Sequence, residues 1–524
     1  MATNQLFATK KLNDLLAEAK GDDRLKRVLG PVSLTALGIG AIIGAGIFVS
    51  TGSAAKEVAG PALMLSYVVA GLTCIFAALC YAEFASMAPV AGSAYTYAYC
   101  TMGELFAWII GWDLVLEYAV GSATVANGWS GYFQAVIAKV GIVLPKELQS
   151  APIKFNHSAP WNDFAAWFEP TGSFVNLPAV IIVAIITAVL VKGISESAGF
   201  NAFMVGIKVF AVLFVILVGY FFINPANYEP FAPFGYGGFS LLGVKDLSVG
   251  WDDKAGKPLG MLAGAAIIFF AYIGFDSVST HAEEAKNPSR DVPIGIIASL
   301  IVCTILYIGV VAVLTGMVSY KDIDKNAGVS SAFKEAAKVE GISPLMKSIL
   351  LSSEVIIACA GVAGITSVLL VMMLSGPRVF LAMARDGLVP KAFFADVHPT
   401  FKTPWLSTIG IGIFVMILAG LLPIDALLEL ANIGTLFAFA VVCAAVMVMR
   451  QTNPTAARPF RCPLVPIVPI LGIALCILLM LSLPVGNWLR LVVWLLIGLV
   501  IYFGYGKQHS TLGKSLRNET AGTP

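Results

Sequence analysis

The chain has 524 residues, of which 58% are hydrophobic and only 12% are charged, and its mean hydropathy is +0.86. This composition lies far outside the range of soluble domains and predicts an all-α polytopic membrane protein. The formal net charge of +2 gives no reason to expect nucleic acid or an acidic partner.

The cysteines and the N-terminal segment carry no processing or metal signal. The eight cysteines form no CxxC pair and lie mostly in apolar runs, so we expect buried hydrophobic residues, with no metal and no cofactor. Residues 1–30 lack the order of a signal peptide, and the first membrane helix is expected to direct insertion. Apolar residues from Leu12 to Leu29 predict a cytoplasmic segment that is either a surface helix or a solvated tail.

Twelve apolar stretches are long enough for the hydrocarbon core, which takes about 20 helical residues. We place them at 31–55, 60–87, 95–127, 176–194, 198–223, 260–282, 293–318, 345–375, 404–422, 425–449, 464–483 and 486–506. With both termini in the cytoplasm, nine of the ten arginines lie on the cytoplasmic side, and Arg490 is the exception. The positive-inside rule therefore predicts that both termini, including a short polar tail at 507–524, lie in the cytoplasm. The location expected is the inner (plasma) membrane, as a multi-pass protein.

The first span carries four glycines in nine positions, from Gly38 to Gly46, and each costs about 1 kcal/mol in a helix interior. Gly44-Ala-Gly46 predicts that the helix stops near Ile43 and restarts near Ala45. Unpaired backbone groups in hydrocarbon cost several kcal/mol each unless they line a cavity or meet a ligand. Free amides suit a carboxylate and free carbonyls suit an ammonium, and an α-amino acid has both groups. The alternative is a glycine face for close helix packing.

A second break is expected in the sixth span, at Phe269-Phe-Ala-Tyr-Ile-Gly-Phe-Asp276. This span runs opposite to the first. Two interrupted spans at matching places in two halves are typical of an inverted-repeat transporter whose site lies where the breaks meet. Helices 1–5 (31–223) and 6–10 (260–449) would form the repeats, and helices 11–12 (464–506) would be added.

Several motifs resemble the amino acid-polyamine-organocation (APC) superfamily. The resemblance rests on the Gly38–Phe48 stretch, on Pro89-Val-Ala-Gly-Ser-Ala-Tyr-Thr-Tyr97 and on Gly111-Trp-Asp-Leu-Val-Leu-Glu-Tyr118. The runs Phe269–Glu284 with Asn287–Pro293, and Gly376–Pro390, are similar to bacterial members of the cationic amino acid transporter subfamily. The resemblance implies a LeuT-like 5+5 fold of 12 helices and transport of amino acids, commonly with protons in bacterial members. The loop between spans five and six departs in length, which leaves the outer vestibule open.

The resemblance also implies a binding site built from backbone. The substrate carboxylate would lie on the amides of Ala45, Gly46 and Ile47, beside Ile43 and Gly44 in the break. The ammonium would be held by the carbonyls of Ile42, Phe270 and Ile273, with the Phe270 ring covering the substrate. From the sequence alone, a phenylalanine in a membrane helix more often faces lipid or packs.

Lys208 places an ammonium inside the fifth span, where a charge costs about 2.5–3.5 kcal/mol at the centre. Desolvation favours the neutral amine, so the side chain could take up and release a proton. The resemblance implies the same role, because a fifth-span lysine in proton-coupled relatives fills the space that a cation fills between spans 1 and 8 of sodium-coupled ones. The alternative is an ammonium that reaches the cytoplasmic interface.

Glu117 and Asp276 are the carboxylates that could meet a cationic side chain of the substrate. Each could instead pair with backbone or hydroxyls and serve gating. Asp113 lies one turn before Glu117 and favours a structural hydrogen bond. Small residues from Cys359 to Gly364 would widen the pocket.

The function expected is proton-coupled uptake of cationic or small neutral amino acids by alternating access, with spans 1, 2, 6 and 7 rocking against the rest. The sequence contains no catalytic motif that would favour an enzyme over a transporter. An antiporter, a potential-driven facilitator of cationic amino acids, and a receptor that binds without translocation remain alternatives. A monomer is expected, and a small accessory membrane subunit remains open.

Overall fold

The computed structural model describes residues 5–11, 29–88, 92–155, 168–193, 198–241, 245–253, 256–324, 328–338, 342–401 and 403–521. The expected surface helix between Leu12 and Leu29 lies outside the described residues, apart from Leu29 itself.

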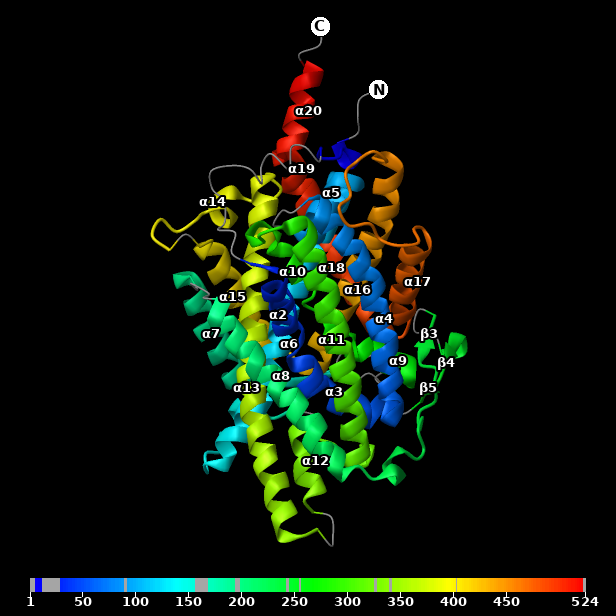
Figure 1. The fold of residues 1–524 in the computed structure, drawn as a ribbon. Coiled ribbons are helices and arrows are strands. Elements are labelled where there is room, and N and C mark those ends of the chain that lie inside the picture. Colours follow the sequence, from blue (N-terminus) through cyan, green and yellow to red (C-terminus); the bar gives the residue numbers. More distant parts are fainter. Residues whose placement is uncertain are drawn as a thin grey trace.

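The protein is a bundle of long helices that run roughly side by side (Figure 1). The longer ones are α2 (Pro31–Ile42), α4 (Leu63–Met87), α5 (Ser93–Thr101), α6 (Glu104–Lys139), α7 (Leu177–Lys192), α8 (Ala198–Gly219), α9 (Met261–Ile268), α11 (Pro288–Met317), α12 (Gly328–Ala336), α13 (Pro344–Arg385), α15 (Trp405–Leu421), α16 (Ile424–Thr452), α17 (Ile467–Leu481), α18 (Val485–Ile501) and α20 (Thr511–Ala521). Short helices are α3 (Thr51–Ala54), α10 (Ser277–Thr280), α14 (Lys391–Phe394) and α19 (Lys507–His509).

Strands occur as three small antiparallel pairs in the loops. They are β1 (Ile153–Phe155) with β2 (Phe168–Pro170), β3 (Phe239–Ser240) with β4 (Ser248–Val249), and β5 (Trp251–Asp252) with β6 (Lys257–Pro258).

Eight helical stretches among the described residues are long and apolar enough to cross a membrane, and three shorter apolar helices accompany them. The first of the eight, Pro31–Met87, includes the first two predicted spans, and α7, α15 and α17 are the shorter helices. Each of the twelve predicted ranges therefore contains an apolar helix in the part of the chain that the structure describes.

Two predicted ranges have wrong boundaries. The range 95–127 begins in α5, which ends at Thr101, and the membrane helix α6 starts only at Glu104 and runs to Lys139. Gly103 separates them with φ +99°, and a Cβ there would lie 2.6 Å from the backbone of Phe7, which crosses at this point. The range that ends at 375 is also too short, because α13 continues through Pro377 to Arg385.

Helix α6 and helix α13 pack along each other. A small residue permits the close approach, since a Cβ on Gly361 of α13 would lie 2.7 Å from the Tyr132 ring of α6. The start of α13 is capped by Ser343, whose hydroxyl accepts the Met346 amide, as expected of a serine at this position.

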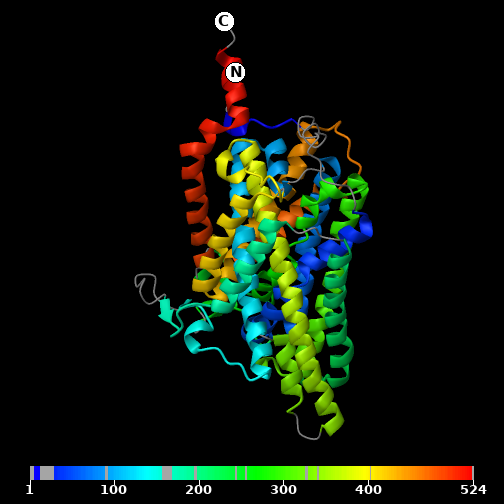
Figure 2. The same ribbon diagram turned by 90° about the vertical axis from the view of Figure 1, so that its left-hand side faces the viewer.

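Both chain ends lie at the same end of the bundle, opposite α12 (Figures 1 and 2). Glu104, fully buried at the start of α6, ties them together. It accepts hydrogen bonds from Gln5 (2.9 Å), Tyr99 (3.0 Å), Tyr502 (2.9 Å) and Ser510. The C-terminal segment, expected only as a polar tail, continues as the helix α20.

Candidate functional site

The first span is interrupted where the glycines predict it. Helix α2 ends at Ile42, Ile43 is extended with ψ 106°, and helical backbone resumes in a turn at Gly46–Ser50. A Cβ on Gly46 would lie 2.2 Å from the Cα of Ala271, and one on Gly44 would lie 2.5 Å from Val368. Glycine is therefore required by close contact as well as by the break.

The sixth span is interrupted in the same way. Helix α9 is followed by a 3₁₀ turn at Phe269–Tyr272, and α10 begins at Ser277. Gly274 has φ +119°, and a Cβ there would lie 2.8 Å from the carbonyl oxygen of Ala41. Positive φ and this contact leave room only for glycine. Gly46 against Ala271 and Gly274 against Ala41 bring the two breaks together.

The end of α2 and the start of the restarted helix both lie at this junction. The amides of Ala45, Gly46 and Ile47 open a helix and have no helical acceptor. Of the last carbonyls of α2, that of Ile39 accepts the Ile43 amide at 2.9 Å. The carbonyls of Gly40 and Ile42 accept hydrogen bonds from side chains, those of Lys208 and Tyr307 respectively. Phe270 and Ile273 lie buried at the other break, and the Phe270 carbonyl accepts the Ile273 amide at 3.2 Å.

Lys208 is fully buried on α8, and its ammonium donates to the carbonyl oxygen of Gly40. Its stem lies against α13, since a Cβ on Gly364 would be 3.3 Å from the Lys208 Cγ. The side chain thus fills the space between α2 and α13. It does not extend to the surface, as the alternative interpretation required.

Asp276 stands at the start of α10 and is already engaged. Its Oδ2 accepts the Tyr118 hydroxyl at 2.7 Å, and its Oδ1 accepts the Gly274 amide at 3.2 Å. Glu117, next to Tyr118 on α6, is buried, and neither of its oxygens has a hydrogen-bond partner among the described residues. The neighbouring Thr435 hydroxyl donates instead to the Ala431 carbonyl.

Asp113 does not make the structural hydrogen bond that the sequence favours. Both of its carboxylate oxygens are buried without a partner in the described part of the chain. Gly434 of α16 lies against this side chain, because a Cβ there would be 2.9 Å from Asp113 Oδ1. Of the small residues expected to widen the pocket, Cys359 is exposed and Gly364 faces Lys208.

Tyr307 on α11 is a residue of this junction that the sequence analysis missed. Its hydroxyl lies 2.9 Å from the carbonyl oxygen of Ile42 and 3.0 Å from that of Ala271. The available signal was a tyrosine near the middle of an apolar span, because a buried phenol needs a hydrogen-bond partner.

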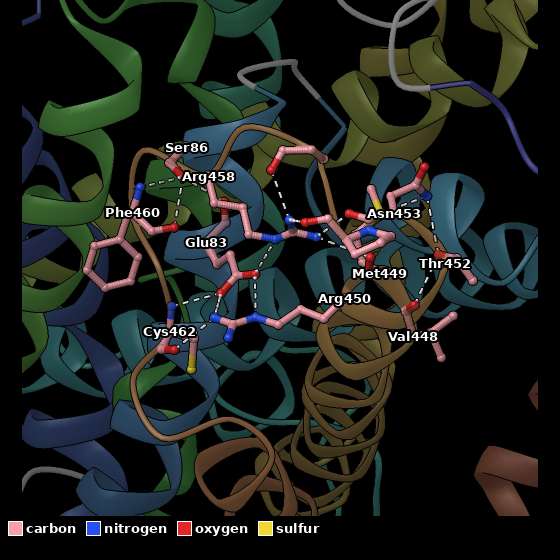
Figure 3. Close-up of polar contacts among 12 residues, drawn as sticks. Glu83, Ser86, Val448, Met449, Arg450, Thr452, Asn453, Arg458, Phe460 and Cys462 are labelled. Carbon is pink, nitrogen blue, oxygen red and sulfur yellow. Dashed lines mark hydrogen bonds and ion pairs between the residues drawn. The ribbon is translucent and has the colours of Figure 1, made fainter.

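Charged side chains cluster at the C-terminal end of α4, near the loop after α16 (Figure 3). The Glu83 carboxylate accepts hydrogen bonds from the Arg450 Nη2 at 2.7 Å and from the Cys462 amide at 2.8 Å. It also forms an ion pair with Arg458 at 3.2 Å. Further along this end, the Arg378 guanidinium lies 3.1 Å from the His281 Nε2. These contacts join the C-terminal end of α4 to α16 and the loop after it, and they join α13 to the residue that follows α10.

Two interrupted helices that meet inside a bundle of apolar helices are typical of membrane transporters. The chain belongs to the amino acid permease family of the APC superfamily, since the amino acid permease family model matches residues 29–510. It is therefore a transporter, and not an enzyme, that resides in the plasma membrane as a multi-pass protein.

Relatives with transporter names are similar over nearly the whole chain. The branched-chain amino acid permease BcaP of Bacillus subtilis is 44% identical over 509 residues, covering 97% of this chain and 99% of that protein. The methylthioribose transporter of the same bacterium is 41% identical, covering 98% and 100%. The vacuolar cationic amino acid transporter 4 of Arabidopsis thaliana is 34% identical, covering 86% and 68%.

Proposed function

We propose that this protein is a proton-coupled importer that carries amino acids inward by alternating access. The observation that carries the proposal is the buried Lys208 ammonium on the Gly40 carbonyl, at the end of the first half-helix. A desolvated amine that leaves this carbonyl when it loses its proton would link the state of α2 to protonation. One proton moving down about 150 mV supplies roughly 3.5 kcal/mol, enough for accumulation of several hundred-fold.

In this proposal the substrate lies between the two breaks. Its carboxylate binds the amides of Ala45, Gly46 and Ile47, at the positive end of the restarted helix. Its ammonium binds carbonyls that close the other half-helices, those of Ile42, Phe270 and Ile273. The Phe270 ring covers the substrate, and Ile43 and Gly44 line the break.

The side chain carried is proposed to be neutral, with branched aliphatic side chains as the first class to test. The 44% identity to a protein named a branched-chain amino acid permease supports this class. Asp276 is compatible with this class, because its oxygens already accept hydrogen bonds from Tyr118 and Gly274 and the carboxylate therefore has partners without a cationic substrate.

A second candidate is an exchanger, or a potential-driven facilitator, of cationic amino acids. Glu117 favours it, because a buried carboxylate without a hydrogen-bond partner in the described residues would suit an incoming cation. The relatives named cationic amino acid transporters support the same reading.

We further propose the 5+5 architecture of 12 helices, with repeats at 31–223 and 260–449, helices 11–12 at 464–506, and both termini in the cytoplasm. The interlocked breaks in α2 and after α9 support this arrangement. The protein is proposed to act as a monomer, with a small accessory subunit left to experiment.

The test is uptake of radiolabelled leucine, alanine and arginine into proteoliposomes, under a pH gradient alone and under a membrane potential alone, for wild type and Lys208→Ala. Leucine or alanine uptake that a pH gradient drives, and that the substitution abolishes, is the expected result. Arginine uptake driven by potential, indifferent to the pH gradient and retained in Lys208→Ala, would establish the second candidate instead. Amino acid binding to the reconstituted protein without uptake would favour a receptor that does not transport its ligand.

A further inference from the structure

Tyr307 of α11 is the side chain that joins the two breaks directly. The Ile42 carbonyl oxygen, 2.9 Å from its hydroxyl, closes α2, and the Ala271 carbonyl oxygen, 3.0 Å away, belongs to the turn after α9. The tyrosine is fully buried. One hydroxyl therefore faces one carbonyl from each interrupted span.

The hydrogen-bond count at this point leaves acceptor capacity unused. A phenol carries a single hydrogen, whereas two carbonyl oxygens offer four lone pairs. Buried acceptors without donors are costly, and a primary ammonium brings three N–H donors. The Tyr307 hydroxyl thus orients two carbonyls that can still accept from a ligand.

The ring of Tyr307 is held by two further tyrosines. The rings of Tyr67 and Tyr272 each lie 5.5 Å from it at 65°, in edge-to-face contact. Tyr67 and Thr51 share a hydrogen bond between their hydroxyls at 2.7 Å, and the Tyr272 hydroxyl donates to the Tyr67 carbonyl at 3.0 Å. Because edge-to-face packing and these bonds fix the ring, the hydroxyl is held at one place between the breaks.

We propose that Tyr307 is a positioning residue that sets the affinity of the site for a primary α-ammonium group. It holds the Ile42 carbonyl, one of those proposed to bind the ammonium, at a fixed separation from the Ala271 carbonyl of the other break, and it acts on the substrate through the Ile42 carbonyl. The inference rests on the proposed function, because it takes the α-amino acid to bind where the breaks meet. The ligands favoured are free α-amino acids, in preference to analogues whose amino group is methylated or missing.

The test compares Tyr307→Phe with Tyr228→Phe in proteoliposomes that take up leucine. Tyr228 is the matched control, since its hydroxyl also donates to a backbone carbonyl of α11, that of Ala312 at 2.7 Å, but away from the breaks. For each protein, KM and Vmax are measured together with inhibition by N-methyl-leucine and by 4-methylpentanoate, the analogue of leucine without its amino group.

Tyr307→Phe is expected to raise the KM for leucine about tenfold, the size of one lost hydrogen bond, with Vmax changed less than about twofold. The preference for leucine over 4-methylpentanoate should fall by a similar factor, and Tyr228→Phe should leave both unchanged. This preference is formed within one sample, so a smaller folded fraction does not alter it.

Wild-type preference in Tyr307→Phe would overturn the proposal, and so would a fall in Vmax alone that Tyr228→Phe shares. If Tyr307→Phe does not yield folded protein, Tyr272→Phe loosens the same ring and should lower the preference by about two- to threefold; an unchanged preference there would overturn it equally. Wild-type protein that neither transports nor binds leucine, alanine or arginine would instead refute the proposed function, and the inference with it.

Discussion

The ammonium of Lys208 on α8 donates to the carbonyl oxygen of Gly40, two residues before α2 ends. A cation at the C-terminal end of a helix is stabilised by the helix dipole, and here that helix is the first half of an interrupted span. The charge on Lys208 therefore interacts directly with the backbone next to the proposed substrate site.

Lys208→Arg separates two possible roles of Lys208, that of a fixed positive charge and that of a group that releases a proton. A guanidinium stays protonated in proteins, so the variant keeps a cation near Gly40 but cannot release a proton. We expect exchange of internal for external leucine to continue while accumulation driven by a pH gradient is lost. Counterflow and gradient-driven uptake in the same proteoliposomes measure the two. Lys338→Arg, at an exposed residue, is the control, and wild-type accumulation by Lys208→Arg would show that Lys208 carries no proton.

Gly46→Ala tests the contact between the breaks. The new Cβ would meet the Cα of Ala271 at 2.2 Å, and backbone must move to admit it. Overpacking of this kind costs about 1–3 kcal/mol, so leucine affinity should fall by roughly 10- to 100-fold. Thermal-shift titration with leucine measures it. Gly206→Ala on α8, where a Cβ has nothing within 4 Å, should bind as wild type; equal affinity in both variants would count against a site at this junction.

Glu83→Gln tests the ion cluster at the C-terminal end of α4 (Figure 3). The substitution leaves Arg450 and Arg458 facing an amide in place of a carboxylate, and breaking a buried pair costs about 3 kcal/mol. We expect a clear fall in the midpoint of thermal unfolding in detergent. Glu335→Gln removes the exposed pair with Lys338 and should cost under about 1 kcal/mol. Equal midpoints for the two variants would mean that the cluster does not stabilise the protein.

Glu104→Gln tests the tie between the chain ends. The amide nitrogen takes the place of one carboxylate oxygen, so it cannot accept either the bonds that Gln5 and Tyr502 donate to Oε1 or those that Tyr99 and Ser510 donate to Oε2. Each buried group left unsatisfied costs about 1–3 kcal/mol. Amide hydrogen exchange should therefore rise in residues 5–11 and 511–517 and stay unchanged in α13. Protection of both termini at the wild-type level would contradict a shared anchor at Glu104.

The apolar helices and both breaks could be predicted from the sequence, because bilayer thickness sets span length and glycines in hydrocarbon are costly. Lys208 could be singled out for the same reason. The start of α6 could not, since it depends on Phe7 crossing at Gly103, a contact between distant segments. Tyr307 was missed because its partners are carbonyls on two other spans, and pairings of that kind appear only when the helices are placed in space.

Helix α13 has 42 residues, which at 1.5 Å per residue is about 63 Å, roughly twice the thickness of the hydrocarbon core. Its two ends must therefore stand in water on opposite sides of the membrane. Because both ends belong to one continuous helix, a reagent that binds either end contacts the same rigid element. An antibody fragment raised against the Pro344 end would report the tilt of this helix without entering the transport path.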